Sequence, residues 1–274
     1  MPEPPRVDSP FSWADYRGFS AFALVGYEPE HVRAVYAQAM ASGWNTARVC
    51  AETEFWDNTG FLKQVPRDLV AVDRLLDTVA RIKGAQVLLI GDCTIKSGNP
   101  AQTDPVGEAW NQQVVDLLQQ KQYQNVALEV VNEGWHPFYK ASRQSVLRRI
   151  DYARSRGVQA GSDDHICLGE ANVPHYLLGR ADFYTFHPCR TDARDNPWDP
   201  PASFLEKVGT VNGHAYLSET VAYSEIEAGG LRTQDRGRIE RYIETCASVP
   251  GCRFTYHSDF GLEAGYYPWF PQAR

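Results

Sequence analysis

The sequence lacks the features that would tie it to a membrane or to nucleic acid. Its apolar runs fall well short of the roughly 20 residues that a membrane-spanning helix needs. Its 27 lysines and arginines are outnumbered by 34 aspartates and glutamates, which gives a net charge of −7, and they form no basic block that could follow a phosphate backbone. We therefore expect neither a membrane nor nucleic acid as a partner.

Signals for export and for metal-binding cysteines are also missing. The first residues, MPEPPRVDSPFSW, contain no basic start followed by an apolar run, so no signal peptide is visible. Both a cytoplasmic protein and a secreted one, as a trimmed chain or as part of a larger protein, stay open. The six cysteines form no C-x-x-C pair: Cys50, Cys93, Cys167, Cys189, Cys246 and Cys252. We expect them to be buried thiols rather than disulfides.

The chain has the size and the apolar content for one large core. It has 274 residues, of which 43% are hydrophobic, and roughly 250 residues are typical of a single (β/α)8 barrel. No linker, low-complexity tract or short repeat divides it, so we expect one domain over residues 1–274. The 12% of aromatic residues include several in Gly/Pro-rich stretches, a composition that suits stacking against sugar rings.

Short β-rich runs alternate with amphipathic stretches from one end of the chain to the other. The strand candidates are 18–25, 45–52, 85–92, 125–133, 158–164, 182–188, 214–220 and 252–259. The helix candidates lie near 29–42, 66–83, 104–121, 140–156, 172–180, 200–208 and 232–247. This order is typical of βα units in a parallel sheet and predicts an α/β fold, a (β/α)8 TIM barrel.

Local signals mark the ends of several helices. Segments 66–68 and 104–105 look like helix starts, because each combines a proline with an aspartate that would meet the helix dipole. Three glycines lie where a helix should end just before a strand: Gly43, Gly84 and Gly157. The final residues, GLEAGYYPWFPQAR, are too rich in Gly, Pro and aromatics for a regular helix. We expect the eighth helix to be missing or replaced by an irregular tail.

Polar residues at the ends of two apolar runs are the candidates for chemistry, because such barrels build their active sites at the C-terminal ends of the strands. In the fourth run, NVALEVVNEGW, strand alternation puts Glu129 and Glu133 on one face and leaves Asn132 and Glu133 at the mouth. The seventh run ends in Ser218-Glu219-Thr220. Strands four and seven face each other across a barrel mouth. Their carboxyl groups can therefore approach the roughly 5–5.5 Å that retaining glycosidases use.

This pattern resembles the cellulase-like glycoside hydrolases of clan A, which are retaining (β/α)8-barrel enzymes. In the clan, the acid/base glutamate directly follows an asparagine at the end of strand four, as Glu133 follows Asn132. A glutamate that closes strand seven is the nucleophile, which is the position of Glu219. The usual proline after the acid/base glutamate is Gly134 here. The resemblance covers most of the chain, from about residue 18 to 259.

The resemblance also assigns roles to charged residues on strands two and four. Arg48 resembles the arginine beside the nucleophile, and its fixed charge would keep Glu219 ionised. Glu129 matches a recurrent glutamate of the fourth strand. The alternative reading of Arg48 is an ion pair with Glu52 or Glu54.

Further residues would line the sugar site. His187 falls where the family has a histidine, and the aromatic residue expected two positions later is Cys189. His187 could equally be an ordinary core histidine. Another group must then hydrogen-bond the nucleophile, and the candidates are three tyrosines: Tyr184, Tyr223 and Tyr256. Where the clan often has a tryptophan after strand eight, this chain has Tyr256, and the candidates for a sugar platform besides it are four tryptophans: Trp56, Trp135, Trp198 and Trp269.

The chemistry that the resemblance implies is double displacement on an O-glycosidic bond of an oligo- or polysaccharide. Glu219 would attack the anomeric carbon while Glu133 protonates the leaving oxygen, and Glu133 would then take a proton from water. Asn132 would bind the sugar 2-hydroxyl. A carbohydrate substrate and no cofactor are expected.

Two other functions stay open. A metal-dependent hydrolase is suggested by acidic and histidine residues near strand ends: Asp163, Asp164, His165, His187, His214 and His257. Against it, strand one has no His-x-His pair, and the spacing of these residues is not that of a dedicated metal site. A carbohydrate-binding barrel without activity is suggested by Gly134, Cys189 and the missing eighth helix, whereas the two glutamates oppose it.

Overall fold

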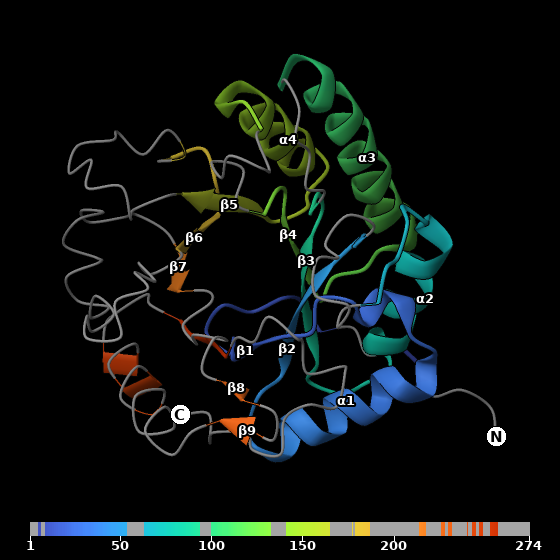
Figure 1. Cartoon of the computed structure of the whole chain (residues 1–274), viewed down its shortest axis with the longest axis vertical. Helices are drawn as coiled ribbons and strands as arrows, with labels where there is room; N and C mark the ends of the chain where they lie inside the picture. Colours follow the sequence, from blue (N-terminus) through green and yellow to red (C-terminus); the bar gives the residue numbers. More distant parts are fainter. Residues whose placement is uncertain are drawn as a thin grey trace.

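The structure is a computed structural model of the whole chain (Figure 1). It describes residues 5–6, 9–53, 63–93, 100–132, 141–164, 177, 179–186, 214–217, 226–227, 230–231, 240, 243–244, 247–248 and 253–256. Within these ranges, side chains are described except at 100–102, 163–164, 186, 214–217, 226–227 and 230–231.

A curved sheet of eight parallel strands forms the centre of the described fold, in the order β10-β1-β2-β3-β4-β5-β6-β7. The strands are β1 (Gly18–Ser20), β2 (Thr46–Cys50), β3 (Gln86–Ile90), β4 (Val126–Glu129), β5 (Ala160–Asp164), β6 (Phe183–Phe186), β7 (His214–Leu217) and β10 (Thr255–Tyr256). Each lies inside one of the eight predicted runs. Because β10 pairs with β1, the last strand returns beside the first, as in a barrel. The predicted (β/α)8 fold is confirmed.

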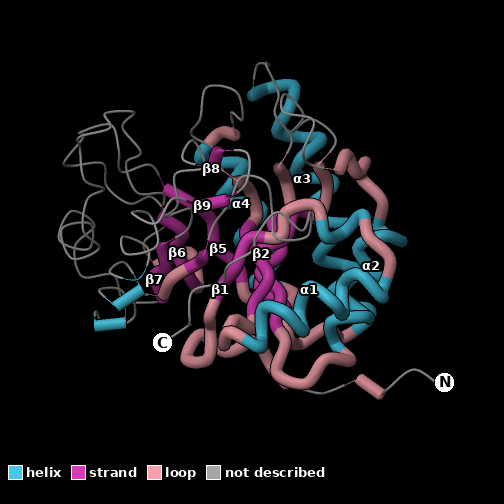
Figure 2. The backbone as a smooth tube through the Cα atoms, turned by 60° about the horizontal axis from the view of Figure 1, so that its bottom comes forward, coloured by secondary structure: helices cyan, strands magenta, loops and turns pink. Residues whose placement is uncertain are grey.

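Helices pack outside the sheet in the described half of the barrel, each after the strand that precedes it in the chain (Figures 1 and 2). They are α1 (Pro29–Ala41), α2 (Leu69–Ala80), α3 (Pro100–Lys121) and α4 (Arg143–Ser155). No helix in the described ranges is long and apolar enough to cross a membrane. The helix candidate at 200–208 and the C-terminal tail lie outside the described residues, so the fate of the eighth helix stays a prediction. The single-domain division also stays a prediction.

Three smaller elements were not predicted. Leu24–Gly26 forms a 3-10 helix (η1), which ends the first strand earlier than the run of apolar residues suggested. β8 (Ile226–Glu227) and β9 (Gly230–Leu231) form a separate antiparallel pair.

Three of the five predicted helix ends are confirmed. Asp68 caps α2, where its carboxylate accepts a hydrogen bond of 2.8 Å from the backbone N–H of Val70. Gly43 and Gly157, with φ values of 89° and 76°, directly follow the C-caps Ser42 and Arg156, as left-handed helix ends require. Gly84 also has a positive φ, 78°, but α2 ends at Ala80 with Arg81 as its C-cap, so Gly84 lies in the turn beyond the helix and the helix end predicted there is wrong. The start predicted at 104–105 is wrong, because α3 begins at Pro100 and contains Pro105. A proline so early in a helix removes one backbone hydrogen bond.

Residues before β1 close the N-terminal end of the barrel. Phe11, Trp13 and Tyr16 pack inside it against side chains of β3, β4 and β6. The indole N–H of Trp13 donates to the Gln159 side chain at 3.0 Å, just before β5. The hydroxyl of Tyr16 reaches Thr255 Oγ1 of β10 at 2.7 Å. Because these side chains fill the N-terminal end, a site inside the described barrel is expected at the opposite end, where the strands have their C-termini.

Candidate functional site

Strands β2 and β4 each place a charged side chain inside the barrel, toward its C-terminal end. Along β2, Ala47 and Val49 face the outer core against the helices, so the alternation of the strand turns Arg48 inward. Along β4, Leu128 faces the same outer core and Glu129 turns inward. The side chains of Arg48 and Glu129 are both 0% exposed.

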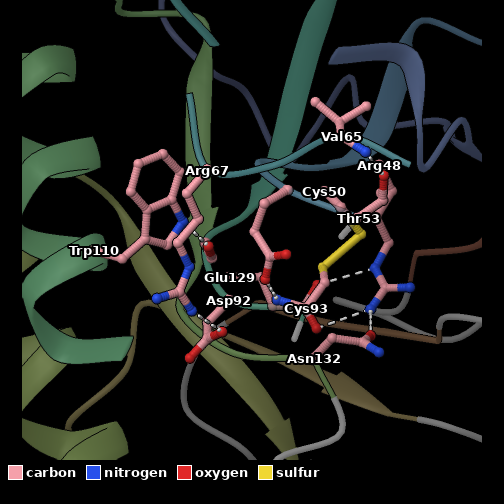
Figure 3. The surroundings of a disulfide bond; sticks show 12 residues. Arg48, Cys50, Thr53, Val65, Arg67, Asp92, Cys93, Trp110, Glu129 and Asn132 are labelled. Atoms are coloured by element: carbon pink, nitrogen blue, oxygen red, sulfur yellow. Dashed lines mark hydrogen bonds and ion pairs between the residues drawn. A yellow bond between two sulfur atoms is a disulfide. The ribbon is translucent and has the colours of Figure 1, made fainter. Parts of the chain in front are cut away.

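Arg48 and Glu129 form a two-point ion pair (Figure 3). Nε of Arg48 donates to Oε2 of Glu129 at 2.9 Å, and Nη2 donates to Oε1 at 3.0 Å. The pairing with Glu129 differs from the alternatives considered for Arg48, since the carboxylate of Glu52 instead accepts from the backbone N–H of Cys93 at 3.1 Å. Two inward-facing charges on nearby parallel strands were the signal for this pair.

The same guanidinium orients Asn132. Nη2 of Arg48 also donates to Oδ1 of Asn132 at 2.7 Å (Figure 3). The backbone N–H of Asn132 donates to the carbonyl of Asp92 at 3.0 Å. Asn132 is only 1% exposed, and its buried Nδ2 has no hydrogen-bond partner in the described structure. Such a donor costs roughly 1–3 kcal/mol when unpaired, so it is a place where a ligand oxygen would be favoured.

Asp92 ties the strand ends to the surrounding helices. Its carboxylate pairs with Arg67, just before α2, at 3.1 Å and with Arg149 of α4 at 2.8 Å. Its backbone carbonyl holds Asn132. The loop that carries Asn132 is therefore anchored through β3 to two helices.

Gly107 of α3 makes room for this ion-pair network. A Cβ at this position would lie 2.2 Å from Oδ2 of Asp92 and 2.4 Å from Nη2 of Arg149. We expect Gly107→Ala to lower the free energy of unfolding by about 1–3 kcal/mol, despite the better helix propensity of alanine. The measurement is urea unfolding of Gly107→Ala and of Gly157→Ala. A Cβ at Gly157 would meet nothing within 4 Å, so Gly157→Ala reports the cost of alanine at a left-handed backbone position, whereas Gly107→Ala reports the clash. A Gly107→Ala protein as stable as wild type would contradict the clash.

The mouth also contains a disulfide, which corrects the expectation of buried thiols. Cys50 at the end of β2 is bonded to Cys93, which follows β3, with a Cα–Cα distance of 6.2 Å (Figure 3). Because β2 and β3 are neighbours in register, the pair is adjacent in space although 43 residues apart in sequence. Phe22 and Ile90 pack around it. The remaining cysteines lie outside the described residues.

Solved structures share this fold, whereas no protein-family model and no curated protein matches the sequence. A protein from Bacteroides vulgatus described as a glycoside hydrolase aligns with a TM-score of 0.63 and 13% identity, over 88% of this chain and 50% of that one. The chain thus spans about half of the Bacteroides protein.

Two further structures match over nearly their whole length. The endo-1,4-β-mannanase of Rhizomucor miehei aligns with a TM-score of 0.60 and 11% identity, over 94% of this chain and 89% of that one. The endoglucanase Cel5A of Pseudomonas stutzeri aligns with a TM-score of 0.55 and 12% identity, over 99% and 100%. The chain has the fold of these glycoside hydrolases.

Two predicted tyrosines lie away from the mouth of this glycoside-hydrolase fold. Tyr256 is fully buried in the core between the barrel and its helices, with its ring 5.9 Å from that of Trp44. The hydroxyl of Tyr184 donates to the carbonyl of Leu177 and accepts from the N–H of Gly179, both at 3.2 Å. These positions give no support to a role in sugar binding or in contacting a nucleophile.

Eight predicted site residues lie outside the described residues, and their roles stay predictions: Glu133, Glu219, His187, Tyr223, Trp56, Trp135, Trp198 and Trp269. The side chains suggested for a metal site lie outside them as well. Within the described side chains, no cluster of His, Cys, Asp or Glu could hold a metal ion. The structure thus brings together Arg48, Asn132 and a partner that sequence reasoning had not joined to them, Glu129.

Proposed function

We propose that the protein is a retaining glycoside hydrolase that cleaves O-glycosidic bonds of an oligo- or polysaccharide. The observation that carries the proposal is the amide of Asn132 at the end of β4. Its oxygen is held by Arg48 and its buried nitrogen has no partner among the described residues, so the amide is prepared to donate to a ligand oxygen. The residue that follows it in the chain is Glu133.

The proposed mechanism uses two glutamates from opposite sides of the mouth. Glu133 is the general acid that protonates the leaving oxygen and then the base that activates water, and Glu219 is the nucleophile. Nδ2 of Asn132 donates to the sugar 2-hydroxyl, where hydrogen bonds strengthen in the transition state. Within the described site, Glu129 balances the charge of Arg48. The pair therefore orients the amide of Asn132 while adding little net charge to the site.

The fold supports a β-linked glucan or mannan as the first substrates to test, because structures with this fold include an endo-1,4-β-mannanase and an endoglucanase. A screen should therefore combine β-1,4-mannan, β-1,4-glucan and other polysaccharides with aryl glycosides of several sugars. The lengths of the products released from the polysaccharide that is cut show whether the cut is internal.

The deciding experiment follows the anomer of the first product by proton NMR for the wild type, Glu133→Gln and Glu219→Gln. We expect retention in the wild type and severe loss in both variants. Glu30→Gln, an exposed carboxylate of α1, is the matched control and should keep full activity. Full activity in either site variant would refute the role of that glutamate, and inversion in the wild type would refute the double displacement.

Asn132→Ala is expected to lower kcat/KM by about 10-fold to 100-fold, because it removes one hydrogen bond that is strongest in the transition state. The loss should shrink strongly for a 2-deoxy glycoside, which offers no 2-hydroxyl to the amide. Parallel kinetics on the glycoside and its 2-deoxy analogue measure this coupling. Equal losses on both substrates would show that Asn132 acts elsewhere.

A further inference from the structure

Glu129 is a buried carboxylate at the proposed site that takes no part in the two-glutamate chemistry. It ends β4, and the sheet register places it between Ile90 of β3 and Gly161 of β5. Both of its carboxylate oxygens accept hydrogen bonds from Arg48. Its side chain is completely inaccessible to solvent. Burial of such a pair adds little net stability, because the desolvation of the two charges costs about as much as their attraction returns.

We propose that Glu129 is a positioning residue, which fixes the guanidinium of Arg48 so that Arg48 fixes the amide of Asn132 for the substrate. The inference rests on the function proposed above. The guanidinium is planar, so anchoring Nε and Nη2 on one carboxylate leaves it no freedom to rotate. Nη2 has two hydrogens, of which one meets Glu129 and the other meets Oδ1 of Asn132.

The orientation of the Asn132 amide matters because its two ends have nearly the same shape and opposite hydrogen-bonding character. While Arg48 donates to Oδ1, the end that remains for a ligand is the Nδ2 donor, which has no partner in the described structure. If the guanidinium is released, the amide can turn over and present an acceptor instead. A hydroxyl bound by Nδ2 would then lose its donor.

Two other described side chains near Arg48, Phe22 and Tyr16, fill the space around the guanidinium without fixing its orientation. The ring of Phe22 lies 5.6 Å from the guanidinium carbon, a contact that tolerates sliding. The Tyr16 phenol fills the barrel interior within the electrostatic reach of Arg48 and Glu129, and burial raises its pKa above the ordinary value, so it stays neutral. Among the described residues, the two-point hold of Glu129 is therefore the contact that sets the plane of the guanidinium.

The test compares Glu129→Gln with Glu108→Gln. Glu108 makes the same kind of two-point pair with Arg148, at 3.1 and 2.6 Å, but on the outer surface of α3 and α4. On an aryl glycoside that the wild type hydrolyses, we expect Glu129→Gln to lower kcat/KM by about 10-fold or more, with a loss of less than about 3-fold on the 2-deoxy analogue. Glu108→Gln should match the wild type on both.

A purely structural role for Glu129 predicts a different pattern. It would reduce activity equally on both substrates and in parallel with stability, and that result would overturn the proposal. The double variant Glu129→Gln, Asn132→Ala should be no worse than Asn132→Ala alone, because both changes remove the same donor; additive losses would also overturn it. If Glu129→Gln does not fold, Glu129→Asp keeps the charge with a shorter reach, and it should show the same selective loss for substrates with a 2-hydroxyl.

A second measurement does not need turnover. The side-chain amide signals of Asn132 in a 15N-labelled protein, assigned through Asn132→Asp, should move in Glu129→Gln or Glu129→Asp and stay in place in Glu108→Gln. Unchanged signals would refute the link from Glu129 to Asn132. A wild type that hydrolyses no glycoside would refute the proposed function instead, while the amide signals would still decide the positioning role.

Discussion

Glu133→Ala is expected to lose about 10²–10⁴-fold in kcat on a polysaccharide, since a sugar alkoxide cannot leave without a proton from a general acid. On a 2,4-dinitrophenyl glycoside the first step should survive, because that phenolate leaves without help. The glycosyl-enzyme would then accumulate, for want of a base to activate water. Stopped-flow measurement should show a burst of dinitrophenolate, and added azide should raise the steady-state rate and give a β-glycosyl azide from a β-glycoside.

Glu219→Ala is the matched comparison, because it removes the other carboxylate of the proposed pair. It should lose activity on every substrate, activated or not, and azide should give the α-glycosyl azide from a β-glycoside by a single displacement. The two variants thus differ in the anomer of the azide product, which NMR reads directly. If the two azide products were exchanged between the variants, the roles of Glu133 and Glu219 would have to be exchanged as well.

The order of the barrel strands could be predicted because most of the strands lie in short apolar runs between turn signals. Residues 86–90, QVLLI, illustrate this, since the strand they form has no competing helical period. The closing of the N-terminal end could not be predicted in the same way. Residues 11–16 have no periodicity, and the side chains that hold them lie far along the chain, at Gln86, Gln159 and Thr255.

The charged part of the site could be predicted only residue by residue. The end of strand four pointed to Asn132, the family resemblance pointed to Arg48, and strand alternation put Glu129 on one face with Glu133. Their contacts depend on the stagger between β2, β3 and β4, which sets how far up the barrel each side chain lies. The stagger between these strands cannot be read from a single sequence. Local sequence signals therefore predict only which face and which strand end a residue occupies, and the pairing of Arg48 with Glu129 follows only from the three-dimensional register.

Removing the Cys50–Cys93 disulfide is expected to lower the free energy of unfolding by about 4 kcal/mol. The bond closes a loop across 43 residues and so lowers the conformational entropy of the unfolded chain, which the variant would regain. For a chain of this size, that corresponds to a fall in Tm on the order of 10 °C. Cys50→Ala with Cys93→Ala is the suitable variant, since the pair packs against Phe22 and Ile90 and serine would bury a hydroxyl there. Thermal unfolding followed by circular dichroism measures the change.

Reductant provides the control for this prediction. Both cysteines are buried, so dithiothreitol should leave the folded wild type unchanged at low temperature and lower its Tm only where unfolding exposes the bond. The double alanine variant should show no such response from this pair. Thiol titration in denaturant without reductant gives the independent check, because the wild type and the variant should release the same number of thiols. Two additional thiols in the wild type would mean that Cys50 and Cys93 are reduced, and the expected gain in stability would then be absent.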